Sequence, residues 1–464
     1  MRAARLMGIL VKILLIVAAS VAGLLALVVA AMLLLGVVLT IVLLLQMLGV
    51  LRRVPFGYNL RNLAVRWPTT LLTALAFTMV VSLLTVMLAF VNGLFRLTQG
   101  SGLPVNVLVL SDGATEESVS SLGFGEITTI DREPTIEKDE QGEPLASWEV
   151  YLVVNQPIEH PKPGDSQRRF MQVRGLKDPA RTGRVHNIAL HPGGAWFSEA
   201  GIQPLPDSAT DEQAIQVVLG EGIARVLGLD KGKPSLTVGD VFPMADRKWI
   251  VVGILQSAGS TFDSEIWAKQ QIVGDKFGKS SYSTVVLRTA DAETAKQTAH
   301  DLSANFKPAV AAQVETTYYE KLSATNYQFF WAAMFVAGFM ALGGVFGIMN
   351  TMFAAISQRQ KDIGVLRILG YARWQILESF FLESLMLALI GGALGCLVGL
   401  LVDGYSATSI LSSGQGGGRS VVFKLVVDAR VLMGGLIFSL IMGNIGGLLP
   451  ALSAIRVRPL ESVR

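Results

Sequence analysis

Five long apolar stretches, separated by charged segments, run along this chain. A helix needs about 20 mostly apolar residues to cross the roughly 30 Å of hydrocarbon in a bilayer. The five stretches reach that length, so the pattern predicts membrane-spanning helices. They lie between Lys12 and Arg52, Arg66 and Arg96, Lys321 and Arg359, Glu383 and Asp403, and Arg430 and Arg456.

The first stretch is longer than one crossing requires. From Ile13 to Val50 it is long enough for a helix of about 57 Å at 1.5 Å per residue. A single helix and a tight two-helix hairpin both fit, but the middle, AAMLLLGVV, has no Pro, Asn or Asp to make a turn, which favours one helix. Because the stretch exceeds the apolar core of a signal peptide and no small-residue cleavage site follows a short run, we expect it to be retained.

The segment between the second and third stretches has the composition of a soluble domain. It holds all four histidines and most of the prolines. VNVLVL, QVVLG, KWIVVGIL and STVVLRT are typical of strands, whereas EGIARVLGL and DAETAKQTAHDLSANF have the spacing of amphipathic helices. The pattern predicts a mixed α+β domain with two lobes outside the bilayer.

Basic residues in short loops mark the cytoplasmic side of a membrane. Three basic clusters fall on one face if the last four stretches each cross once, and the large domain then lies on the other face. The clusters are Arg52, Arg53, Arg61 and Arg66; Arg359, Lys361, Arg367 and Arg373; and Arg456, Arg458 and Arg464.

The predicted fold class is an integral membrane α-helical bundle, with four core transmembrane helices plus one extra N-terminal apolar helix, and a large α+β extracytoplasmic domain. The core helices are expected at 69–95, 326–356, 376–402 and 430–455. The remaining segments are an extra N-terminal span (6–51), a cytoplasmic amphipathic elbow (52–68), the extracytoplasmic domain (96–325), a cytoplasmic loop (357–375), a short extracytoplasmic loop (403–429) and a cytoplasmic tail (456–464).

Composition narrows the function classes. The chain has 464 residues, 51% of them hydrophobic and 16% charged, which indicates a membrane protein. The net charge of +3 is spread beside apolar runs, so no nucleic-acid partner is expected. A single cysteine, Cys396, excludes a disulfide within the chain.

Signals for catalysis are weak. GDKFGKS, from Gly274 to Ser280, has three residues between its glycines where a phosphate-binding loop requires four, so we expect a surface turn. His160, His186, His191 and His300 lack metal-ligand spacing and are expected to be ordinary loop or surface histidines. The sequence predicts no catalytic residue, no metal site and no enzyme.

The segment RQKDIGVLRILGYARWQILESFFLES lies between the third and fourth stretches. Its pattern predicts a short cytoplasmic helix that Gly370 ends. Such a helix can lie on the membrane surface or dock into a groove of a partner. The apolar positions are Ile363, Leu366, Ile368 and Leu369, and the polar ones are Lys361, Asp362 and Arg367.

This segment resembles the signature of FtsX-like ABC transporter permeases of the MacB, or type VII, group, with its acidic-Ile-Gly, Arg-x-Leu-Gly, Ile-Leu and Phe-Leu-x-Glu pattern. Three further pieces are similar to that family in the same order: NLRNLAVRWPTTLLTALAFTMV, then VVLGEGIARVLGL with LTVGDVF, and the ending LLPALSAIRVRPLESVR. The resemblance covers residues 55 to 464. The first apolar stretch has no counterpart in most members.

The resemblance implies a coupling helix that fits a cleft of an ATPase subunit. No Walker motif occurs in the sequence, so the ATPase is expected in trans, with ATP and Mg bound there and no cofactor on this chain. A second permease copy or a paralogue, and an extracytoplasmic adaptor, are further expected partners. The residues expected to contact the ATPase are Asp362, Ile363, Gly364, Leu366, Arg367, Leu369 and Gly370.

The implied function is mechanotransmission in the cytoplasmic (inner) membrane. ATP hydrolysis by the partner would reshape the extracytoplasmic domain, for export of a small molecule or peptide or for extraction of a lipid or lipoprotein. The alternative is an FtsX-like signalling protein that activates an extracytoplasmic enzyme, such as a cell-wall hydrolase, without transport.

Glycines at four-residue spacing predict close helix packing inside the bilayer, although glycine is also generally frequent in such helices. Packing within one subunit and contact between two copies both fit. The glycines are Gly343 with Gly347, Gly391 with Gly395 and Gly399, and Gly443 with Gly447.

Two carboxylates, Glu378 and Glu383, lie in the fourth stretch. Ionisable groups at that depth usually have a partner or line water. We expect a salt bridge to an elbow arginine, Arg61 or Arg66, and no proton relay.

Overall fold

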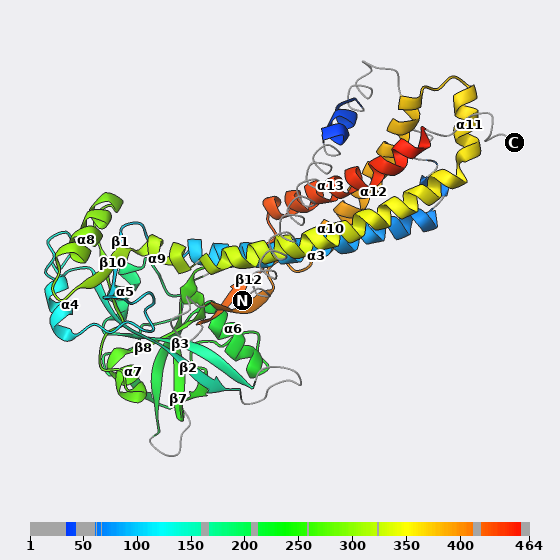
Figure 1. Cartoon of the computed structure of the whole chain (residues 1–464). Coiled ribbons are helices and arrows are strands. Elements are labelled where there is room, and N and C mark those ends of the chain that lie inside the picture. Colours follow the sequence, from blue (N-terminus) through cyan, green and yellow to red (C-terminus); the bar gives the residue numbers. More distant parts are fainter. Residues whose placement is uncertain are drawn as a thin grey trace, which may run out of the picture. The chain divides into compact units, whose positions relative to one another are not determined.

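The computed structural model describes residues 34–42, 61, 63–65, 67–158, 167–205, 212–257, 259–322, 324–411 and 419–455 (Figure 1). The chain divides into two compact units. The helical unit comprises Met1–Ala89, Trp331–Asp403 and Val427–Arg464, and the sheet unit comprises Phe90–Phe330 and Gly404–Val426.

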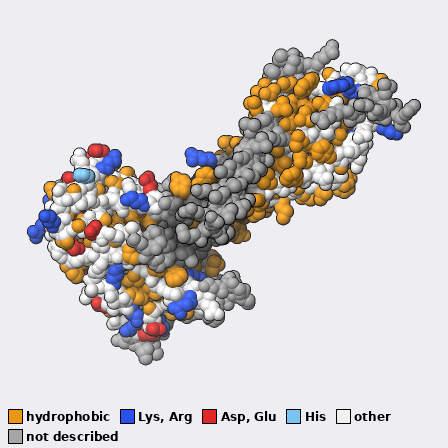
Figure 2. All heavy atoms as spheres, viewed as in Figure 1, with side chains coloured by type: hydrophobic (Ala, Val, Ile, Leu, Met, Phe, Trp, Pro, Cys, Tyr) orange, Lys and Arg blue, Asp and Glu red, His pale blue; other side chains and the backbone are white. Residues whose placement is uncertain are grey.

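The helical unit is built from long apolar helices. Among the described residues, four helices are long and apolar enough to cross a membrane. Figure 2 shows that hydrophobic side chains dominate the visible face of these helices, while charged side chains gather on the sheet unit. The elements are α3 (Trp67–Gln99), α10 (Ala324–Gln358), α12 (Arg373–Leu400) and α13 (Ala429–Ala454), with the short α11 (Gln360–Ile368) between α10 and α12.

Most or all of three predicted segments, the first span, the elbow and the tail, lies outside the described residues. Of the predicted first span, the structure describes residues 34–42, which are helical. The choice between one long helix and a hairpin therefore stays a prediction, as do most of the elbow and the tail from residue 456.

Small residues allow α13 to pack closely against both α12 and α10. The hydroxyl of Ser439 donates to the carbonyl of Ala388 at 2.7 Å, and a methyl group added at Gly446 would lie 2.9 Å from Ile348 Cγ2 of α10. Phe77, Phe381 and other buried apolar side chains fill the space between the helices.

The sheet unit is organised around one ten-stranded mixed sheet. The strand order is β10-β1-β9-β2-β3-β8-β5-β7-β6, with β4 paired to β5. Among the described residues, β3 with β8 and β5 with β7 are the parallel pairs, and the other pairs are antiparallel. The strands are β1 (Asn106–Ser111), β2 (Ala146–Pro157), β3 (Arg168–Leu176), β4 (Ile202–Pro204), β5 (Gln213–Leu219), β6 (Val241–Met244), β7 (Arg247–Ile254), β8 (Glu265–Lys269), β9 (Thr284–Arg288) and β10 (Val310–Val314).

Helices cover this sheet and connect its strands. The capping signals are local, as at Asp291, whose carboxylate accepts from the amides of Glu293 and Thr294 at the start of α8, both at 2.9 Å. The helices are α4 (Phe124–Ile130), α5 (Pro179–Val185), α6 (Glu221–Asp230), α7 (Gln270–Phe277), α8 (Ala292–Asn305) and α9 (Glu315–Leu322), with the 3-10 turn η1 (Thr261–Ser264).

The predicted α+β class is confirmed, and the predicted strands and helices correspond to β1, β5, β7, β9, α6 and α8. The expectation of two lobes is wrong at the level of the sheet, because its strands form one hydrogen-bonded series. That continuity depends on strand pairings between distant segments, which local patterns do not encode.

The segment between α12 and α13, expected to be a loop, is a β-hairpin that belongs to the sheet unit. Its strands are β11 (Ser406–Leu411) and β12 (Arg419–Lys424). Val421 and Phe423 of β12 pack in one buried cluster with Leu94 and Leu97 of α3.

Candidate functional site

Gly370 terminates helix α11. Gly370 has a φ of +92°, which favours glycine. The amide of Gly370 donates to the carbonyl of Arg367 at 3.2 Å, and that of Tyr371 donates to the carbonyl of Leu366 at 3.1 Å. These two bonds form a Schellman motif, so the predicted stop at Gly370 is confirmed.

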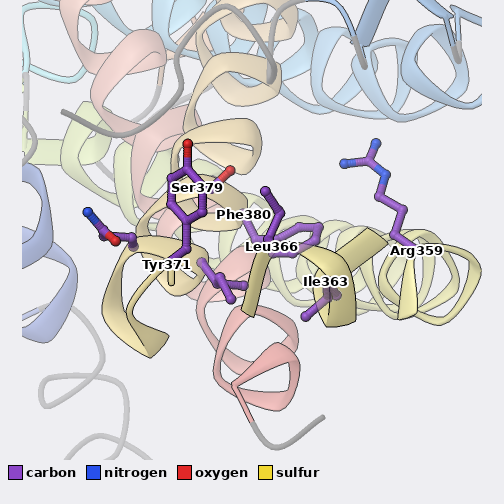
Figure 3. Close-up of a pocket in the computed structure, with 8 residues that line it drawn as sticks. Arg359, Ile363, Leu366, Tyr371, Ser379 and Phe380 are labelled. Carbon is purple, nitrogen blue, oxygen red and sulfur yellow. The ribbon is translucent and has the colours of Figure 1, made fainter. Parts of the chain in front are cut away.

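One side of α11 is held by the rest of the helical unit. Ile363 is 1% exposed and Gly364 is buried. Leu366 lies in a small pocket of about 20 Å³ with Tyr371 and Phe380 (Figure 3). Ile363 belongs to one buried apolar cluster with Ile376 and Phe380 of α12, so this side of α11 is packed on α12.

The other side of α11 presents apolar side chains to the surroundings. Val365, Ile368 and Leu369 are 48%, 65% and 70% exposed, and Trp374 at the start of α12 is 62% exposed. Large apolar groups that are exposed together mark an interaction surface for protein or lipid. We call Val365, Ile368, Leu369 and Trp374 the α11 face.

The residues predicted to contact a partner differ in how exposed they are. Asp362, Leu369 and Gly370 are exposed, whereas Leu366 and Arg367 are half-buried. Ile363 and Gly364 are buried against the chain itself, which assigns them to the holding side. The predicted set omitted Val365, Ile368 and Trp374, and a helical wheel centred on Leu369 identifies Val365 as its neighbour one turn earlier.

Glu383 forms a buried ion pair with Arg359. The two guanidinium nitrogens of Arg359 lie 2.8 and 3.0 Å from the carboxylate oxygens, and both side chains are under 10% exposed. Glu383 thus pairs with a residue that was not predicted, and because Arg66 lies outside the described residues, an elbow partner for these carboxylates stays a prediction. Arg359 is the N-cap residue of α11, so this pair fixes the start of α11 on α12, while Glu378 is also buried.

Three of the predicted packing glycines lie against α3. A methyl group added at Gly395 would lie 2.7 Å from Val81 Cβ and 2.9 Å from the carbonyl of Thr78. Gly391 and Gly399 meet Phe77 and Thr85 in the same way. In contrast, added methyl groups at Gly343 and Gly347 of α10 would meet none of the described residues within 4 Å, so their role stays a prediction.

Gly395→Ala is expected to destabilise the helical unit, because overpacking a tight interface costs about 1–3 kcal/mol. Gly434→Ala is the matched control, since an added methyl group there would meet only Leu88 Cδ1 among the described residues, at an ordinary contact distance of 3.6 Å. Thermal unfolding of the full chain in detergent should show a lower midpoint for the first variant and an unchanged or higher midpoint for the second. Equal midpoints would contradict the packing described for α3 and α12.

A buried ionic cluster in the sheet unit was not predicted. Arg174 of β3 lies at its centre, with its side chain 1% exposed. Its guanidinium contacts Glu265 through two bonds of 2.6 and 2.7 Å, Glu117 at 2.7 Å, and Glu149. Burial alone would lower the pKa of Arg174, but the carboxylates of Glu117, Glu265 and Glu149 raise it well above its ordinary value.

His186 extends this cluster toward α9. Its Nε2 lies 2.8 Å from Glu149, and its Nδ1 lies 3.0 Å from Glu315. Burial would lower the pKa of His186, yet the two carboxylates raise it to about 10. His186 is therefore cationic at neutral pH, and the expectation of an ordinary loop or surface histidine is wrong for this residue.

The segment that resembles a phosphate-binding loop is the end of a helix. Gly274 lies within α7, and Gly278 caps that helix with a φ of +69°. Lys279 donates to the carbonyl of Tyr151 at 3.1 Å. No group of three or more metal-ligating side chains occurs in the part of the chain that the structure describes.

Comparison with known proteins places the chain in a family. Residues 70–305 match the MacB-like periplasmic core domain, and residues 334–459 match the FtsX-like permease C-terminal domain. The chain thus belongs to the FtsX-like permeases that carry a MacB-like periplasmic core domain, and the predicted family is confirmed.

Similar proteins include an uncharacterized ABC transporter permease of Methanocaldococcus jannaschii, 31% identical over 55% of this chain and 63% of that protein. The uncharacterized ABC transporter permease YknZ of Bacillus subtilis is 29% identical over 48% of this chain and 57% of that protein. The macrolide export ATP-binding/permease protein MacB of Burkholderia cenocepacia is 21% identical over 77% of this chain and 53% of that protein. The matches thus span less than two thirds of each relative's own length.

Two solved structures are also similar. The extracellular domain of YknZ matches 45% of this chain and 98% of that structure, with 14% identity and a TM-score of 0.30. The periplasmic region of MacB from Actinobacillus actinomycetemcomitans matches 48% of this chain and 94% of that structure, with 13% identity and a TM-score of 0.32.

Proposed function

We propose that the chain is the permease subunit of an ABC transporter in the cytoplasmic membrane and works with an ATPase subunit supplied in trans. Family membership and the four candidate membrane helices support this proposal. ATP and Mg would bind to the partner, because the sequence has no Walker motif. The sheet unit would lie outside the membrane.

The observation that carries the proposal is the α11 face. Its apolar side chains are exposed on a helix whose start is fixed by the Arg359–Glu383 pair and whose end is fixed by Gly370. A short helix held at both ends transmits displacement without bending, as a coupling helix must. The neighbouring basic residues favour the cytoplasmic side, where the ATPase is.

A second copy of the chain, or a paralogue, is the second partner we propose. Helix α10 is the least buried of the four candidate spans. Phe335, Phe339 and Phe346 are each more than 60% exposed along it, and Gly343 and Gly347 leave room for a close approach. Lipid can cover the same side chains, so the oligomeric state in a nanodisc tests this point.

The proposed output is mechanotransmission. Closure of the ATPase dimer would displace α11, and the long helices α3 and α10 would carry that movement to the sheet unit. Export of a small molecule or peptide and extraction of a lipid or lipoprotein both fit this output. In either case an extracytoplasmic adaptor would receive the cargo. The alternative, activation of an outer enzyme without transport, uses the same helices, and the large ten-stranded sheet unit favours transport over it.

Leu369→Asp tests the coupling surface. An exposed apolar residue at the centre of an interface contributes about 2 kcal/mol or more, so affinity for the ATPase that co-purifies with the wild-type chain should fall roughly thirtyfold. Phe124→Asp is the control, because Phe124 is 60% exposed but lies in the sheet unit. Unchanged affinity in both Leu369→Asp and Ile368→Asp, with normal unfolding midpoints, would refute the assignment.

A further inference from the structure

Three connections join the sheet unit to the long helices. Residues 100–105 lead from α3 to the first strand of the sheet, α9 leads from the sheet to α10, and the β11–β12 hairpin lies between α12 and α13. Figure 1 shows α9 leading from the β1 and β10 side of the sheet toward α10. If movement of the helices is to reach the sheet, these three connections must keep fixed positions relative to one another.

The carboxylate of Glu315 bonds the segment after α3 to α9. Glu315, the first residue of α9, is fully buried. Its Oε2 accepts from the amide of Leu103 at 2.9 Å and from the side-chain amide of Asn106 at 2.8 Å. The backbones approach closely here, because a methyl group added at Gly102 would lie 3.0 Å from Glu315 Cγ. The segment after α3 therefore cannot shift relative to α9 without breaking these bonds.

One hydroxyl fastens the third connection. Ser264, which ends η1, is 2% exposed. Its Oγ accepts from the amide of Val422 at 2.7 Å and donates to the carbonyl of the same residue at 3.2 Å. Nearby, the amide of Thr261 donates to the hydroxyl of Ser101 at 2.7 Å, which ties η1 to the segment after α3 as well.

The ionic cluster joins these two fastenings. From Glu315 the contacts run through His186 to Glu149, then through Arg174 to Glu265. Glu265 directly follows Ser264 in the chain. Each side chain along this path is at most 1% exposed, so water does not weaken the contacts.

We infer that this path, from Glu315 through the ionic cluster to Ser264, is a buried linkage that makes the three connections move as one body. A hydrophobic core of equal volume would stabilise the sheet at least as well, so stability alone is a weak reason for these charges. Hydrogen bonds end the path at each connection, and inside it the step from Glu315 to His186 is an ion pair at 3.0 Å. Hydrogen bonds of this kind fix relative positions, which apolar packing does not. The mechanical role of the linkage rests on the proposed function, but the linkage itself exists in the chain without its ATPase.

Hydrogen exchange of the full chain in nanodiscs tests the linkage with no ATPase present, so its outcome is independent of the proposed function. Glu315→Ala removes both carboxylate oxygens and with them the bonds to Leu103 and Asn106 and the contact with His186. Amides in 100–106 and also in the distant hairpin strand 419–424 should exchange about tenfold faster or more. The exchange rates of amides in 213–219 (β5) and 247–254 (β7) should stay unchanged. Asp230→Asn, which removes only the surface pair with Arg169, is the control.

Faster exchange confined to the neighbourhood of residue 315 would overturn the inference. If Glu315→Ala speeds exchange throughout the sheet unit, Ser264→Ala decides, since it removes only the hydroxyl bonded to Val422. Ser264→Ala should speed exchange in both 419–424 and 100–106. A change limited to 419–424 would show that the connections are fastened separately and would overturn the linkage.

Discussion

Arg174→Met is expected to unfold the sheet unit at temperatures where the wild-type chain is folded. The variant leaves Glu117, Glu149 and Glu265 buried beside one another without their shared cation. Breaking one buried ion pair from one side costs about 3–5 kcal/mol, and three carboxylates depend on this arginine. The loss therefore approaches the whole stability of a typical domain, about 5–15 kcal/mol.

Tryptophan fluorescence during heating measures this effect. The indole of Trp267 donates to Glu265 at 2.9 Å, so one of the 7 tryptophans that contribute to the emission lies in the cluster. Arg169→Met is the control, because Arg169 pairs with Asp230 at the surface, where such a pair contributes at most about 1 kcal/mol. Similar midpoints for Arg174→Met and Arg169→Met would contradict the structural role given to Arg174.

Arg359→Met is expected to destabilise the helical unit by about 3–5 kcal/mol, because it leaves the carboxylate of Glu383 buried and unpaired. The only cysteine of the chain, Cys396, provides the measurement. It is 6% exposed within α12, so a thiol-reactive fluorophore labels it only as the helices separate on heating.

The double variant Arg359→Met, Glu383→Leu is the matched control. Replacing both members of a buried pair by apolar residues is often neutral or stabilising, so the double variant should unfold later than Arg359→Met alone. An equal or larger loss in the double variant would mean that the bulk of Arg359, for instance its packing over Phe380 at 5.7 Å, matters more than its charge.

Local signals made much of the fold predictable from the sequence. Runs of branched apolar residues identified β1, β5, β7 and β9, and charge-free stretches identified the four long helices. Gly370 was predictable because a left-handed residue after a helix is a backbone requirement that glycine meets.

Long-range contacts account for most of what was missed. Arg174 and Glu265 are 91 residues apart, and Asn106 and Glu315 are 209 apart, so no local pattern places them together. His186 looked like a surface histidine because its partners belong to other elements. Arg359, the partner of Glu383, is 24 residues away in the sequence, and a basic residue at the end of a span indicates topology without indicating which carboxylate it pairs with.

The α11 face shows a different limit. Its apolar positions were visible in the sequence, but which of them face the chain depends on how α11 packs on α12. Ile363 is 1% exposed while Ile368 is 65% exposed, although both are isoleucines of the same short helix. Periodicity predicts a face and does not say whether the chain or a partner covers it.

Site-specific photocross-linking in intact cells tests the central claim, that an ATPase docks on α11 across the membrane from the sheet unit. A photoreactive phenylalanine analogue at position 369 should capture a polypeptide with Walker motifs, identified by mass spectrometry, whereas the same analogue at position 124 should not. Capture of lipid alone at position 369, or of the same ATPase at position 124, would contradict the account.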